Sequence, residues 1–206
     1  MRHGSRPLVV VAAMLACAPA FAADTLLDTY GPDQLADGLR WSLFDDITTG
    51  GTAAQSLAVR FDVLSATTVT GIQTSIAASG LIQLRIVEDS SGVPLGTIRF
   101  DTPLNNPVAN TLLSGLHIAL DPGRYWLAAV VTPTGSGNWT GGGSDSSQPW
   151  SFALDSINDN WTSAGTSDAP AARLFTSAVP EPAHWVLLLA GGAGLAGLRR
   201  ARQQRG

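Results

Sequence analysis

The fold is decided by the stretch Ser56-Leu57-Ala58-Val59-Arg60-Phe61-Asp62-Val63, in which every second side chain is strongly apolar. An alternation with a period of two is typical of a β-strand that is buried on one face. The apolar set is Leu57, Val59, Phe61 and Val63, and the other set is Ser56, Ala58, Arg60 and Asp62. We therefore expect a strand here, with its apolar set facing a core.

Two alternating stretches further along the chain predict a hairpin. We expect Ile82, Leu84, Ile86, Ile98 and Phe100 to face the core, and Gln83, Arg85, Thr97, Arg99 and Asp101 to face outward. Residues 89–94 between them have the composition of a turn. Further strands are expected at 67–76, 112–120, 125–132, 150–154 and 172–176. The run 125–132 is apolar on both faces, which is typical of a central strand.

About eight short strands with frequent turn signals and no long amphipathic helix predict an all-β domain. The expected architecture is an antiparallel β-sandwich, jelly-roll-like in size, over residues 23–178. A body of this length buries roughly 70% of the surface of its unfolded chain. It is therefore expected to fold without disulfides or a structural metal.

Composition excludes several classes of protein. The chain has 206 residues with one Cys and three His. That excludes an internal disulfide framework and a Cys-cluster zinc site. Residues 23–178 hold six arginines and 15 acidic residues, a formal net charge of −9. An acidic body argues against binding to nucleic acid or to anionic lipid.

Residues 1–22 have the organisation of a secretory signal peptide. Arg2 and Arg6 precede an apolar run at 8–18, and Ala20-Phe21-Ala22 offers small residues at a cleavage site. We place cleavage by signal peptidase after Ala22. An uncleaved anchor helix is the alternative, and a lipoprotein site at Cys17 fits less well.

The C-terminal segment, residues 179–206, carries a sharper signal. It begins with Val179, Pro180, Glu181 and Pro182, and continues with a largely apolar stretch of 16 residues at 183–198. The prolines end any strand or helix. The Gly- and Ala-rich run predicts a short transmembrane helix. A basic tail at 199–206 stays cytoplasmic by the positive-inside rule. Its cations are Arg199, Arg200, Arg202 and Arg205.

This order of parts resembles the PEP-CTERM sorting tail, which occurs in Gram-negative bacteria that make exopolysaccharide. The resemblance covers Val179 to about Arg205, with the core motif at Pro180-Glu181-Pro182. It implies recognition near that motif by exosortase, an integral-membrane processing enzyme. A plain membrane anchor is the alternative.

The body resembles extracellular β-sandwich domains of the "choice-of-anchor" type, which occur with interchangeable surface anchors. The resemblance is carried by Gln55-Ser56-Leu57, by the hairpin from Leu84 to Gly96, and by the stretch from Leu120 to Leu127. It implies a sandwich fold and leaves the activity open, because the family has no assigned catalytic activity.

Few residues of the body suit catalysis. His117 lies on the strand face opposite Leu116 and Ile118, where we expect it to be solvated. The pairs Glu88-Asp89 and Asp45-Asp46 are the carboxylate candidates for glycoside hydrolysis. Adjacent strand residues point to opposite faces, which weakens both pairs.

Two weaker binding sites are indicated late in the body. Asp155, Asn158 and Asp159 offer oxygen ligands in one loop, which is a weak calcium candidate. Trp139, Trp150 and Trp161 lie in a polar, Gly-rich segment. Exposed rings there would stack on sugars, but we favour the interpretation that these rings close the open end of the sandwich.

The sequence as a whole predicts a secreted protein of the cell surface or extracellular matrix, such as a biofilm. Before processing, residues 183–198 anchor it in the inner membrane. The body is expected to be non-enzymatic, structural or adhesive, and to need no cofactor. The alternative is a carbohydrate-binding module for exopolysaccharide. A glycan-active enzyme is the third interpretation.

Overall fold

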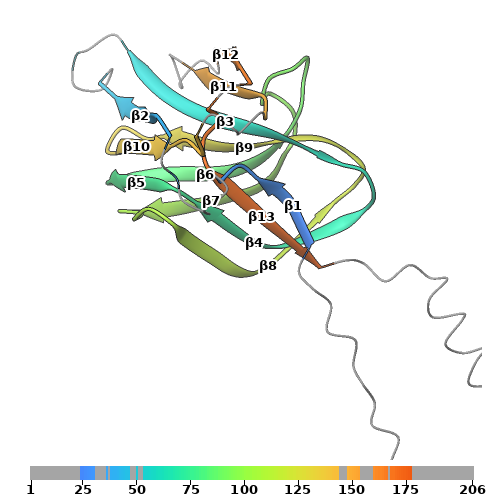
Figure 1. Ribbon diagram of the computed structural model, residues 1–206. Coiled ribbons are helices and arrows are strands. Elements are labelled where there is room, and N and C mark those ends of the chain that lie inside the picture. The colour runs from blue at the N-terminus through green and yellow to red at the C-terminus, as the bar shows by residue number, and fades with distance from the viewer. Residues whose placement is uncertain are drawn as a thin grey trace, which may run out of the picture.

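The computed structural model describes residues 24–30, 36, 38–46, 50, 53–143, 148–153, 160–166 and 168–177. These residues form thirteen strands and no helix, and the ladders are antiparallel (Figure 1). The predicted all-β class is confirmed. Among these residues no helix is long and apolar enough to cross a membrane. The expected signal peptide, sorting motif, transmembrane helix, basic tail and calcium loop lie outside the described residues.

The strands form two main sheets. The smaller has the order β1 (Asp24–Asp28), β13 (Ala172–Ser177), β4 (Thr67–Thr74) and β8 (Thr111–Leu120). The larger has the order β5 (Ile76–Ser79), β10 (Ser136–Thr140), β2 (Arg40–Asp45), β3 (Ala54–Val63), β9 (Gly123–Val131), β6 (Leu81–Glu88) and β7 (Ile98–Asn105). In addition, β11 (Trp150–Ala153) pairs with β3, and β12 (Trp161–Gly165) pairs with β11.

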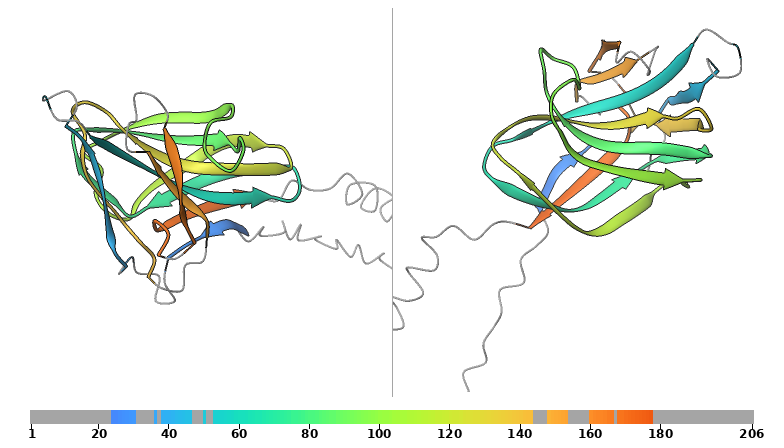
Figure 2. Two further views of the ribbon diagram at one scale, coloured as in Figure 1. Left: turned by 90° about the horizontal axis from the view of Figure 1, so that it is seen from above. Right: turned by 180° about the vertical axis from the view of Figure 1, so that it is seen from behind.

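The core lies between the smaller sheet and the concave face of the larger one, which is visibly curled in Figure 2. The apolar set of β3 is buried there, as its period predicts. The smaller sheet contributes Val69, Ile72 and Leu174 from the opposite side. As expected for a central strand, β9 lies between β3 and β6, and its side chains from Tyr125 to Ala129 are buried on both faces.

The prediction of a single strand at 67–76 is wrong, because the chain forms two strands there. The chain forms β4 in the smaller sheet, bends at Ser75, and enters the larger sheet as β5. The bend is stabilised by the Ser75 hydroxyl, which donates to the Thr140 carbonyl at 2.6 Å. Ser75 is itself fully buried, so this hydrogen bond satisfies a polar group inside the body. This segment therefore links the two sheets.

The expected inward orientation of Ile98 is also wrong. Phe100 pairs with Ile86 and contacts the core, but the next pair is Ile98 with Val87, because the ladder between β6 and β7 has a bulge. A bulge inserts one residue, here Arg99, and shifts the following side chains to the other face. Ile98 consequently lies on the outer face of the larger sheet and is 49% exposed.

The body begins and ends at one corner. β1 and β13 are antiparallel neighbours, and Asp24 pairs with Thr176. Figures 1 and 2 show the start of β1 and the end of β13 side by side, with β11 and β12 at the far side of the body.

Candidate binding site on the outer face of the larger sheet

Two of the three candidate sugar-binding tryptophans are buried. Trp139 is 0% exposed, and its indole Nε1 donates to the Ala171 carbonyl at 2.9 Å. Trp150 is 5% exposed, and its ring centroid lies 4.3 Å from that of Trp41. Neither ring presents a face to solvent, so Trp139 and Trp150 are wrong as candidate sugar-stacking residues. Their burial agrees with the favoured interpretation that these rings pack into the sandwich.

Trp161 has a different position. It is partly buried and packs on a small apolar cluster formed by Ala58, Trp126 and Ala128, with Val130 beside it. This cluster lies on the outer face of β3 and β9, which the alternation of β3 assigns to solvent. Ala58 does lie on the outer face, but it is buried there rather than solvated, because Trp161 from the added strand β12 packs over this part of the sheet.

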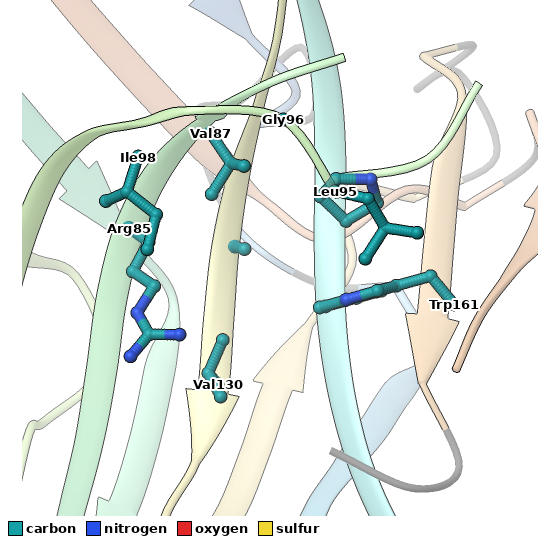
Figure 3. Close-up of a pocket in the computed structure, with 9 residues that line it drawn as sticks. Arg85, Val87, Leu95, Gly96, Ile98, Val130 and Trp161 are labelled. Carbon is teal, nitrogen blue, oxygen red and sulfur yellow. The ribbon is translucent and has the colours of Figure 1, made fainter. Parts of the chain in front are cut away.

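A cavity of about 100 Å³ opens beside Trp161. Its floor is made by side chains of β6 and β9, and its walls come from β7, from β12 and from the loop that joins β6 to β7. Figure 3 shows Trp161 and Leu95 on one side and Arg85 and Ile98 on the other, with Val87 and Val130 between them. The remaining lining residues are Pro94, Gly96 and Ala128.

The loop that forms one wall is anchored by Asp89. Its Oδ1 accepts a hydrogen bond from Trp126 Nε1 at 2.6 Å, and its Oδ2 accepts one from the Gly92 amide at 3.2 Å. The turn itself has left-handed backbone at Ser91 and Gly92, with φ of 57° and 88°. Glycine adopts this conformation without steric cost. Asp89 thus holds Pro94 and Leu95 above the sheet.

We expect Asp89→Ala to lower the free energy of unfolding by about 2 kcal/mol, because it leaves the buried indole N–H of Trp126 without its acceptor. Asp89→Asn retains one acceptor and is expected to lose less than half as much. Urea unfolding followed by tryptophan fluorescence measures both. Equal stability of Asp89→Ala and the unchanged protein would contradict the anchoring role.

The charged side chain that lines the cavity is Arg85, and it forms an ion pair with Asp101, which is not a lining residue. Arg85 Nε lies 3.1 Å from Asp101 Oδ2, and their side chains are 28% and 38% exposed. An exposed pair of this kind contributes about 1 kcal/mol or less to stability. Arg85 nevertheless brings guanidinium N–H donors into a cavity that the apolar side chains of Ile98 and Val87 also line.

In the first carboxylate pair considered for glycoside hydrolysis, Glu88 forms an ion pair and Asp89 anchors the loop. Glu88 Oε1 lies 2.6 Å from Arg99 Nη2. Hydrogen bonds from Thr97 and Arg99 hold the pKa of Glu88 below its usual range, whereas a general acid for glycoside hydrolysis requires a raised pKa. In the other pair, Asp45 is the last residue of β2 and Asp46 follows it directly.

The remaining candidates give no further site. His117 is exposed on β8, on the face opposite buried Ile118, which confirms the expected orientation. No three His, Cys, Asp or Glu side chains come close enough to hold a metal ion within the described part of the chain. Comparisons of the chain with protein-family models, with curated proteins and with solved structures found no match.

Proposed function

We propose that this chain is an exported surface or extracellular-matrix protein whose C-terminal segment is a PEP-CTERM sorting signal processed by exosortase. The observation that carries the proposal is the order of Val179-Pro180-Glu181-Pro182, the apolar run 183–198 and the arginine cluster that follows. A signal peptide at 1–22 exports the chain. Residues 183–198 hold it in the inner membrane until processing, and the body between is a jelly-roll-like sandwich.

The positions of the first and last strands of the body, β1 and β13, support this proposal. Because Asp24 pairs with Thr176, an export signal and a membrane tether would leave the body at the same corner. The strands farthest from that corner then face away from the membrane (Figure 1). This arrangement suits a body that is displayed at a surface and has a structural or adhesive, non-enzymatic role.

Intact mass of the protein isolated from its own host, with and without the exosortase gene, tests the sorting proposal. The expected mature form begins near Ala23 and ends near the Pro-Glu-Pro motif only when the gene is present. A C-terminus at Gly206 in both strains would identify a plain membrane anchor instead. Replacement of Glu181 by Ala provides a second check, since it alters the motif and leaves the apolar run intact.

A carbohydrate-binding role is the second candidate. The observation that favours it is the cavity at Trp161, where a partly exposed indole lies across from Arg85, which is paired with Asp101 outside the cavity lining (Figure 3). This candidate is independent of how the tail is processed.

A further inference from the structure

We propose that the cavity between Trp161 and Arg85 binds one pyranose unit of a neutral polysaccharide. The inference deepens the second candidate function and rests on it. The site differs from the tryptophan cluster expected from the sequence, because most of it comes from β6, β7, β9 and the loop that joins β6 to β7. Of the three tryptophans, Trp161 is the one that lines it.

The apolar side chains of the site are more exposed to solvent than core side chains are. Leu95 is 48% exposed and Ile98 is 49% exposed, and both line the cavity with Trp161. The bulge at Arg99 is what turns Ile98 to this face. Apolar side chains gathered around a partly buried indole provide a surface for the C–H groups of a sugar ring.

The polar half limits the class of ligand. A guanidinium carries five N–H donors in a fixed fork, and the Asp101 carboxylate accepts hydrogen bonds. Hydroxyls of a pyranose in the cavity would therefore find N–H donors on Arg85, and an acceptor on its ion-pair partner Asp101, which lies outside the cavity lining. A purely apolar ligand would remove this pair from water without replacing its hydrogen bonds, which is costly.

The net charge of the body and the volume of the cavity further restrict the class of ligand. The net charge of −9 on residues 23–178 disfavours an acidic polymer. The cavity of about 100 Å³ is smaller than the roughly 300–1,000 Å³ of pockets that enclose a whole small molecule. A site of this size suits one unit of a chain that lies across the open sheet face, rather than an enclosed free sugar.

Native gel electrophoresis of the full chain in mild detergent, with polysaccharide in the gel, tests the proposal. The neutral probes are hydroxyethyl cellulose, dextran and galactomannan, and alginate is the acidic one. We expect at least one neutral polymer to retard the protein, and Trp161→Ala to weaken that binding about tenfold or more. Leu95→Ser, which alters an exposed wall residue, is expected to weaken it as well and guards against misfolding of the first variant.

The matched control is Leu112→Ala, since Leu112 is 53% exposed but lies on β8 of the smaller sheet. We expect its binding to equal that of the unchanged protein. The proposal is overturned if no neutral polymer retards the protein, if only alginate does, or if Trp161→Ala and Leu95→Ser bind as tightly as Leu112→Ala. Because no tail processing enters this measurement, failure here leaves the sorting proposal standing.

Discussion

A Gly142→Ala substitution is expected to lower the free energy of unfolding by about 3 kcal/mol, at the upper end of the usual cost of overpacking. A methyl group on Gly142 would overlap the carbonyl oxygen of Thr29. The obstacle is backbone, so no side-chain rotation relieves it.

Thr29 has little freedom to move away. Its amide donates to the Ala172 carbonyl at 3.0 Å, and its hydroxyl donates to the Pro170 carbonyl at 2.7 Å. Gly142 is held equally firmly, since its amide donates to the Ala169 carbonyl at 3.1 Å. Relief of the overlap therefore requires that the segment 169–172 be displaced from its neighbours, and this segment leads directly into β13.

Urea unfolding of the full chain in detergent, followed by tryptophan fluorescence, measures the effect. For a body of about 150 residues the same loss corresponds to a fall in Tm of roughly 6–12 °C. Gly123→Ala is the matched control, because a methyl group there meets Tyr125 Cε2 at an ordinary 3.4 Å. We expect that control to stay within about 0.5 kcal/mol of the unchanged protein. Equal stability of the two variants would show that the contact at Thr29 is loose.

The strands with strong alternation were predictable from the sequence, and the short ones were not. The apolar side chains at alternate positions of β3 and β6 are buried, from Leu57 to Val63 and from Ile82 to Ile86, so the period of these strands is visible in the sequence. β10 and β12 have five residues each, with sequences SGNWT and WTSAG that lack this period. Their strand conformation depends on pairing with β2, β5 and β11, which is tertiary information.

The faces of the strands were predictable only where the ladders are regular. One bulge between Ile86 and Val87 reverses Ile98 and creates a wall of the candidate site. Nothing in the local composition signals this bulge, because Arg99 and Ile98 both suit a strand. The covering of Ala58 by Trp161 was equally hidden, since it joins segments about 100 residues apart in the chain.

Replacing Trp139 by Ala is expected to lower the free energy of unfolding more than the same change at any other tryptophan of the larger sheet. Its ring is fully buried in the main core, and Trp→Ala changes at such positions cost about 3–5 kcal/mol. Trp139→Phe keeps part of the ring and removes the N–H that donates to Ala171. The Ala171 oxygen also accepts from the Ser75 amide at 3.1 Å, so it does not become unpaired. We therefore expect Trp139→Phe to cost about 1–3 kcal/mol.

Measuring both the free energy of unfolding and polysaccharide binding for Trp139→Ala and Trp161→Ala distinguishes a core role from a binding role. Trp161 packs on a small outer cluster, so Trp161→Ala is expected to lose about 1–2 kcal/mol while polysaccharide binding falls. Trp139→Ala is expected to lose more stability yet retain binding at temperatures where it remains folded, because its ring has no exposed face. Urea unfolding and affinity electrophoresis give the two readings. If Trp139→Ala instead abolished binding while losing less than about 1 kcal/mol, its ring would belong to the binding surface and its place in the core would be wrong.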